Sequence, residues 1–301
     1  MKKQIIIAIF ALMSAQTTVA QDKIPVYVSI VPQRYFVQQI GKDLVDVHVM
    51  VSPGASPAIY EPKPRQMADI STAKAYFSIG VPFEGRWLSK IASSNPAMKV
   101  VATDREVQKI PMAVGYHLDE PVDGEHPDGR EHGEDDHGHG GMDPHIWLSP
   151  PLVKIQARHI LHGLEEIDPA HGSRYEQNYR AFIRKIDSLD EALNRKFAKW
   201  KDRRFIVFHP SWGYFAQAYN LKMTAIEVQG KDPKPAQLQS LIKHARHKGI
   251  KVVFVQPQFS MRSAKLIARE IGGKVAFADP LAENWADNLL GVADQFKAAL
   301  K

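Results

Sequence analysis

The sequence predicts an α/β protein of two similar lobes, each a parallel sheet flanked by helices. Three observations lead to this fold class. Short β-branched runs alternate with helical stretches, which is the βαβ pattern of parallel sheets. The alternation occurs twice, on either side of a polar, helix-prone middle region. A chain of 301 residues, 44% of them hydrophobic, is also long enough to bury two cores.

Strands and helices are expected in the same rhythm in both halves. The first half has strand-like runs at 24–32, 45–54, 73–82 and 99–104, with helical spacing at 33–41 and 62–74. The second half has strand-like runs at 203–210, 221–228, 250–257 and 274–280, with helices expected at 233–249, 261–273 and 284–301. The runs of the first half end in Pro, Gly or Asp, as strands do.

The middle region, 149–200, is polar and is interrupted once, near DPAHG. Its stretch from Ser173 to Trp200 contains neither Pro nor Gly, so it allows one helix of roughly 40 Å at 1.5 Å per residue. Such a helix either joins the two lobes or packs along one of them. The expected organisation is therefore an N-terminal lobe at 22–148, a connecting helix at 149–200 and a C-terminal lobe at 201–301.

The N-terminus predicts export. Residues 1–20 combine Lys2 and Lys3, an apolar run and a small-residue end at Ala20, which is typical of a signal peptide. The run is too short to cross a bilayer, which takes about 20 apolar residues. With no cysteine for a lipid anchor, the periplasm is the expected location. The net charge of +6 without an aromatic-rich basic stripe argues against nucleic-acid binding.

Metal-binding side chains follow the predicted strands. His209 and Asp279 each come directly after a strand of the second half, and His145 lies where the first lobe meets the middle region. Ligands of open α/β sheets bind beyond the carboxyl ends of the strands. Two imidazoles and one carboxylate suit a compact divalent site.

These residues also carry a family resemblance. The runs VMVSPGASPAIYEPKPRQM, DPHIWLSP, FHPSWGYFAQAYNL, VVFVQPQFS and FADPLAENW occur in this order. Together they resemble the ZnuA-like or TroA-like metal-binding proteins of zinc and manganese ABC transporters. The resemblance implies two lobes bridged by one long helix, with the metal between them. It also implies the ligands His145, His209 and Asp279.

The resemblance further implies a periplasmic monomer that delivers its metal to a cognate ABC permease and its ATPase. Zinc is expected because His209 stands where manganese-preferring members place a carboxylate, and a nitrogen ligand favours zinc over manganese. Manganese or iron uptake is the alternative within the family. We expect no enzyme, since the sequence lacks a His-Glu-x-x-His or Gly-x-Ser-x-Gly motif. A zinc hydrolase and a periplasmic zinc buffer are the alternatives of other classes.

The fourth ligand position departs from the family pattern. Members usually read Pro-Gly-Ala-Ser-Pro-His, whereas this sequence ends the run with Ala58. Zinc tolerates three protein ligands plus a water. The replacements left open by the sequence are Glu61, Tyr60, Glu227 and His139.

Residues 117–142 form an acidic, His- and Gly-rich segment with almost no large apolar residues. Such a composition does not fold a core and predicts a disordered loop. The loop is either a solvated linker or a weak collector of metal ions, because histidines that are neutral near pH 7.5 are competent ligands. The collecting residues would be His117, His126, His132, His137 and His139.

Overall fold

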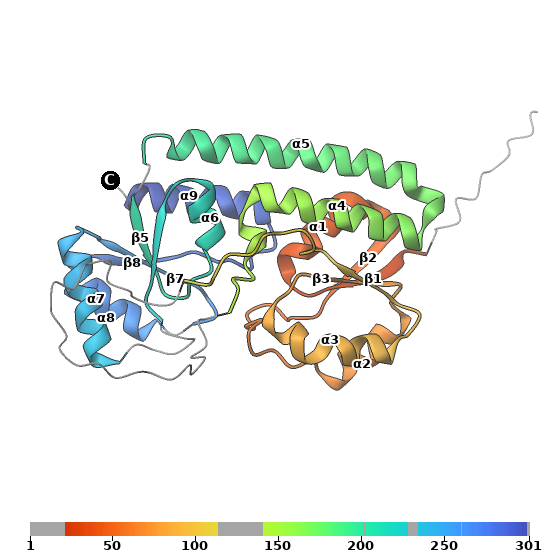
Figure 1. The fold of residues 1–301 in the computed structure, drawn as a ribbon, viewed down its shortest axis with the longest axis horizontal. Coiled ribbons are helices and arrows are strands. Elements are labelled where there is room, and N and C mark those ends of the chain that lie inside the picture. The colour runs from red at the N-terminus through yellow and green to blue at the C-terminus, as the bar shows by residue number, and fades with distance from the viewer. Residues whose placement is uncertain (1–21, 114–140, 201–202, 228–233, 260, 300–301) are drawn as a thin grey trace, which may run out of the picture.

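The computed structural model describes residues 22–113, 141–200, 203–227, 234–259 and 261–299. These residues form two α/β lobes that lie side by side (Figure 1). One long helix, α5 (Gly172–Phe197), runs along both lobes. The expected fold class is therefore confirmed.

The N-terminal lobe contains a four-stranded parallel sheet in the order β2-β1-β3-β4. Its strands are β1 (Ile24–Val28), β2 (Val45–Val49), β3 (Ala75–Ser78) and β4 (Lys99–Ala102). Its helices are α1 (Val31–Gly41), α2 (Pro64–Asp69), α3 (Pro82–Ser94) and α4 (Pro150–Ile167). Three of these helices start with proline, which suits the first helical position because its missing N–H would have no partner there.

The C-terminal lobe repeats this arrangement. Its parallel sheet has the order β6-β5-β7-β8, formed by β5 (Arg204–Val207), β6 (Lys222–Ala225), β7 (Val252–Val255) and β8 (Lys274–Phe277). Its helices are α6 (Gly213–Ala218), α7 (Pro235–His247), α8 (Arg262–Glu270) and α9 (Trp285–Ala299). The two sheets share one strand order, so their carboxyl edges have equivalent positions in the two lobes.

Helix α5 connects the lobes physically. It packs on α4 and α1 in the first lobe and on α9 in the second. Its buried side chains recur every three to seven residues, which places them on one face; they are Tyr175, Phe182, Ile186, Leu189, Leu193 and Phe197. Of the two placements that the sequence left open for this helix, the structure shows the one that joins both lobes.

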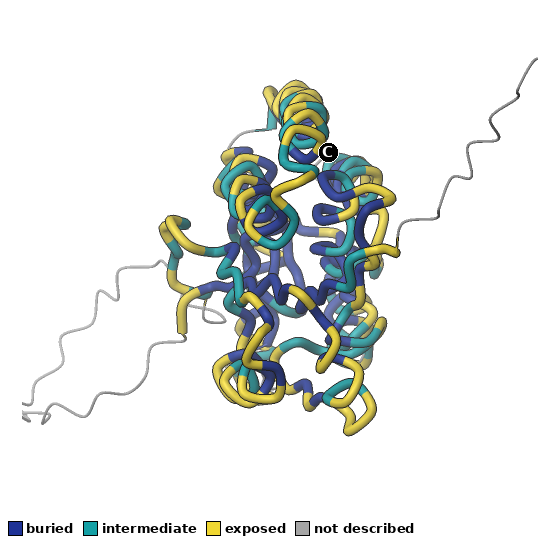
Figure 2. The backbone as a smooth tube through the Cα atoms, turned by 90° about the vertical axis from the view of Figure 1, so that its right-hand side faces the viewer, coloured by how far each residue is buried: buried dark blue, intermediate teal, exposed yellow. Residues whose placement is uncertain are grey.

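The hydrophobic core continues from one lobe into the other. The ring of Phe36 on α1 meets that of Trp285 on α9 edge to face, with centroids 5.1 Å apart. The Trp285 indole donates to the carbonyl of Trp147 at 2.7 Å, and the Trp147 indole donates to the carbonyl of Pro280 at 2.7 Å. Figure 2 shows that the buried backbone lies inside and the exposed backbone on the outer helices. The lobes are thus held together by dry, hydrogen-bonded contacts.

Two helices escaped the sequence analysis. Helix α3 has Gly85 in its first turn, and α6 is only six residues long, so neither shows a clear helical period. Short 3-10 helices occupy Lys42–Leu44, Ile70–Thr72, Ile146–Leu148 and Pro169–His171. No helix of the described residues is long and apolar enough to cross a membrane.

The expected domain bounds stay predictions, and so does the signal peptide at 1–20, which lies outside the described residues. Region 149–200 holds two helices: α4 packs on β3 and β4 of the first lobe, and α5 contacts both lobes.

Candidate metal centre

A cavity of about 50 Å³ contains both histidines of the predicted site. The loop at Ser56–Ala58 lines it from the first lobe, and Phe259, Pro280 and Leu281 line it from the second. A buried water needs only ~10–15 Å³ of such volume. The cavity is therefore large enough for a metal ion with a water ligand.

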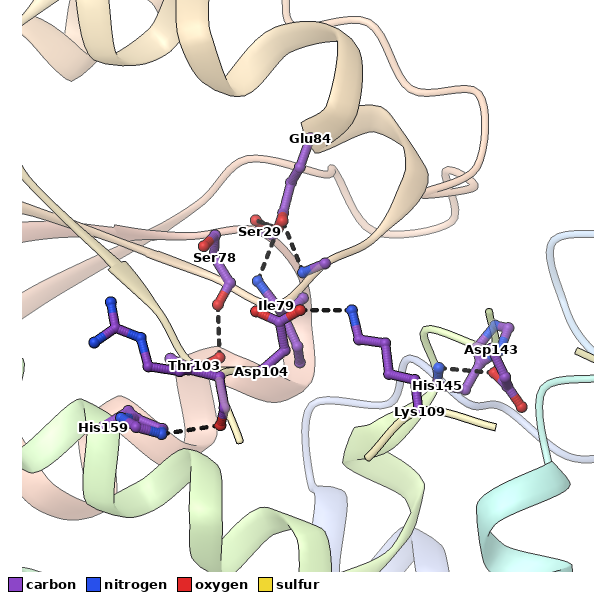
Figure 3. Close-up of polar contacts among 12 residues, drawn as sticks. Ser29, Ser78, Ile79, Glu84, Thr103, Asp104, Lys109, Asp143, His145 and His159 are labelled. Carbon is purple, nitrogen blue, oxygen red and sulfur yellow. Dashed lines mark hydrogen bonds and ion pairs between the residues drawn. The ribbon is translucent and has the colours of Figure 1, made fainter. Parts of the chain in front are cut away.

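His145 is fixed by the residue two positions before it. The backbone N–H of His145 donates to Asp143 Oδ1 at 2.9 Å, and its Nδ1 lies 2.7 Å from the same oxygen (Figure 3). Directly after it, the 3-10 helix Ile146–Leu148 is fully buried. Burial lowers the pKa of His145 from its ordinary value, against the opposing attraction of Asp143. The imidazole is thus held neutral, the state in which it binds metals.

His209 is fixed in a similar way from the second lobe. It follows β5, and its Nδ1 lies 2.7 Å from Oε1 of Glu227, just past β6. Gln256, just past β7, accepts from the His209 backbone N–H at 3.2 Å and donates to its carbonyl at 2.6 Å. The Phe259 ring stacks on the imidazole, with centroids 4.8 Å apart.

The two imidazoles face one another across the lobes. Their ring centroids are 5.2 Å apart at an interplanar angle of 73°. Each Nδ1 is bonded to a carboxylate, which leaves each Nε2 as the available metal-binding atom. Asp143 is 1% exposed and Glu227 is 4% exposed, so two negative charges are buried beside the cavity. A cation between the imidazoles would compensate them, because burying an uncompensated charge is costly.

Asp279 does not line the cavity that the two imidazoles line. It lines a neighbouring cavity, and Gln258 and Leu281 line both cavities. Its Oδ1 accepts from the Leu281 backbone N–H at 2.9 Å and from Gln258 Nε2 at 3.3 Å. Within the part of the chain that the structure describes, no three His, Cys, Asp or Glu side chains are grouped closely enough to hold a metal ion. The structure brings His145 and His209 together, and the place of Asp279 as a ligand stays a prediction.

The other candidate ligands have different surroundings. Ala58 lines the cavity, so the position of the missing family histidine faces the site. The Tyr60 hydroxyl donates to Gln66 Oε1 at 2.7 Å, and Glu61 is exposed. Neither Tyr60 nor Glu61 lines the cavity, and Glu227 orients His209.

The predicted collecting loop, with His117, His126, His132, His137 and His139, lies outside the described residues. The residues on either side of it pair with each other: Met112 N–H donates to the Gly141 carbonyl at 3.1 Å, and Pro111 and Met142 form an antiparallel bridge. Met112 also lines the cavity.

The sequence analysis missed the residues that orient the imidazoles. Asp143 precedes His145 by two positions, a spacing that lets a carboxylate bond to the following backbone N–H. Gln256 lies just past β7, and it reaches His209 from that neighbouring strand. Only the first of these had a signal in the local sequence.

Fold and site together define a two-lobed α/β protein with a paired-histidine centre between its lobes. The chain belongs to the family described as ZnuA, zinc-uptake complex component A periplasmic, which matches residues 26–299. It is 30% identical to the high-affinity zinc uptake system protein ZnuA of Bacillus subtilis, over 93% of this chain and 86% of that protein. A crystal structure of ZnuA is 40% identical, with a TM-score of 0.82, over 93% of this chain and all of that one.

The zinc-binding lipoprotein AdcA of Streptococcus pneumoniae is 26% identical over 98% of this chain. The chain spans only 58% of that relative's length. Relatives of this kind therefore contain a further part that this chain does not match.

Proposed function

We propose that this protein captures a zinc ion between its lobes and delivers it to an ABC permease for uptake. The observation that carries the proposal is the facing pair of His145 and His209, each bonded through Nδ1 to a buried carboxylate. Carboxylate–histidine pairs of this kind are the usual outer support of zinc ligands. The names of the related proteins, zinc-uptake and zinc-binding, support the same ion.

Zinc is preferred here over manganese and iron because two nitrogen ligands dominate the centre. Manganese favours oxygen ligands, and imidazole suits zinc. We propose that Asp279 gives the third ligand after leaving Gln258, and that water fills the fourth position beside Ala58. Manganese or iron uptake is the alternative ion choice.

The proposed partners are a cognate permease with its ATPase, and the protein acts as a monomer in the periplasm after removal of a signal peptide at 1–20. It performs no catalysis. A zinc hydrolase needs a base free to activate water, and the two nearest carboxylates, Asp143 and Glu227, are bonded to imidazole Nδ1 atoms. This arrangement favours binding of a metal ion over metal-assisted hydrolysis.

The test is metal analysis of the protein purified from the periplasm, followed by competition among zinc, manganese and iron in titration calorimetry. One tightly bound zinc ion per chain, with weaker manganese and iron, is the expected result. Preference for manganese would overturn the choice of ion. A deletion strain grown with chelator should show a defect that zinc reverses, whereas a free zinc buffer without a transporter would leave uptake rates unchanged.

A further inference from the structure

The outer helices of the C-terminal lobe carry a concentration of positive charge that the metal centre does not use. Between Lys234 and Ala278 the sequence has nine lysines and arginines and one acidic residue, Glu270. The whole chain has a net charge of only +6, so the rest of it is slightly acidic. The positive field of the molecule is therefore concentrated on this region.

Five of these nine basic side chains belong to two neighbouring helices. Helices α7 and α8 lie together at the outside of the C-terminal lobe, on the other side of its sheet from α5 (Figure 1). Lys243 on α7 and Lys265 and Arg269 on α8 are exposed. Lys265 and Arg269 are four residues apart and thus share a helix face.

Three of these cations have no carboxylate partner in the described part of the chain. Glu270, the one carboxylate of the region, is paired with Arg246, whose guanidinium lies 3.1 Å from Oε2. Arg246 also donates through Nε to the Glu270 backbone carbonyl at 2.9 Å. Among the residues that the structure describes, Lys243, Lys265 and Arg269 form no ion pair.

An apolar groove lies between the same helices. Leu238 and Ile242 of α7 and Leu266 of α8 line it, with Lys243 and Arg246 beside them. Its volume is about 540 Å³. A helical surface with apolar residues flanked by lysine and arginine is the arrangement that binds at a membrane interface.

We propose that this α7–α8 face is a docking surface for the anionic phospholipid headgroups of a membrane. Three of the five cations on these helices are arginines and two are lysines. Arginine forks match the oxygens of a phosphate, and lysine adds a compact point charge. Phosphate headgroups give both kinds of cation an anionic partner, and the apolar groove beside these cations suits the boundary between headgroups and acyl chains. Neither helix contains Phe, Tyr or Trp, so no stacking platform for nucleic acid is present on them.

Docking would hold the protein near a membrane-embedded partner, but the proposal does not depend on metal binding. The test is sedimentation of the full chain with vesicles of equal parts phosphatidylglycerol and phosphatidylcholine, against vesicles of phosphatidylcholine alone. The variant combines Lys243→Gln, Lys265→Gln and Arg269→Gln. Because each cation near an anionic surface contributes about 1 kcal/mol, the triple variant should bind the anionic vesicles about 100-fold more weakly.

The matched control removes the same charge from α5, with Arg184→Gln, Lys185→Gln and Arg195→Gln, all exposed. It should bind like the unchanged protein. Equal losses in both triple variants would show a net-charge effect and overturn the proposal. It would also fail if the unchanged protein did not bind the anionic vesicles at low salt. Zinc affinity, measured on the same samples, should be equal in all three and reports separately on the proposed transport function.

Discussion

The two sheets share a strand order, yet their carboxyl edges are used differently. At the edge of the first sheet, the buried Glu84 accepts from the backbone N–H groups of Ile79 at 3.0 Å and Gly80 at 2.8 Å, and from the Ser29 hydroxyl (Figure 3). Ser29 also bonds to the Tyr76 hydroxyl at 2.7 Å. These polar groups satisfy one another and leave nothing for a ligand.

At the carboxyl edge of the second sheet, the polar side chains orient one imidazole, that of His209, towards the first lobe. Gln256 and Glu227 fix the backbone and the Nδ1 of His209, and its ring faces His145. The first lobe adds His145 only after β4, and Ala58 occupies a loop position that lines the cavity. A strand order therefore predicts where a site can form, while the hydrogen-bond partners decide which edge binds.

Loss of an imidazole should have the largest effect. His209→Ala and His145→Ala each remove one of the two facing nitrogen ligands. We expect each to weaken zinc binding by more than about 100-fold, beyond the loss that follows from changing an outer partner. Titration calorimetry with a competing chelator measures this. His159→Ala is the control, since His159 is partly buried on α4, away from the cavity, and bonds to the Arg105 carbonyl. Unchanged affinity in His209→Ala would refute the site.

The carboxylate partners should come next. Glu227→Gln keeps an oxygen near His209 Nδ1 but removes a buried negative charge. Such outer partners are typically worth 10–100-fold in metal affinity, so a loss of about 10- to 100-fold is expected. Asp143→Asn tests the equivalent bond of the first lobe. The control is Glu283→Gln, because Glu283 is exposed and paired with Arg34. It should leave the zinc affinity unchanged, and a similar loss there would show that the buried carboxylates Asp143 and Glu227 have no particular effect on zinc binding.

The sequence could predict the features of this site that depend on neighbouring residues, but not those that depend on contacts between distant segments. All eight strands were predicted because β-branched runs are local, and His145 and His209 followed from the strand ends and the family motifs. The direction of Asp279 could not be predicted, because Gln258 from another strand end binds it. The hydrogen bond between Ser29 and Glu84 could not be predicted either, since these residues are 55 positions apart and only the folded sheet brings them together.

Restoring the family histidine should give the first lobe a second metal ligand, in its own loop. Ala58 lines the cavity beside both imidazoles. Ala58→His should therefore raise zinc affinity by about 10-fold or more, which corresponds to ~1.4 kcal/mol. Its neighbour Ile59 is 75% exposed and does not line the cavity. Ile59→His is the matched control, and equal gains in both variants would mean that the added imidazole acts away from the centre.

The smallest effect is expected at the carboxyl edge of the first sheet, around Glu84. It should change the free energy of unfolding rather than the zinc affinity. Burial raises the pKa of Glu84 to about 6, although its hydrogen bonds from Ser29, Ile79 and Gly80 act in the opposite direction. The folded state therefore binds this proton more tightly than the unfolded chain, whose carboxyl has the ordinary value of 4.5. The stability that this carboxyl contributes is complete below pH 4.5 and is lost as the pH rises through 6, a change of about 2 kcal/mol.

Glu84→Gln keeps the size and an acceptor oxygen but does not titrate. Other carboxylates titrate in both proteins, so the informative quantity is the difference in unfolding free energy between Glu84→Gln and the unchanged protein. As the pH rises from about 4.5 to 7.5, this difference should shift in favour of the variant by about 2 kcal/mol. Urea unfolding of the metal-free proteins measures it, with the exposed Glu61→Gln as control. A difference in unfolding free energy that does not change with pH would show that the pKa of Glu84 is not raised by burial. A changed zinc affinity would show that Glu84 also affects the metal centre.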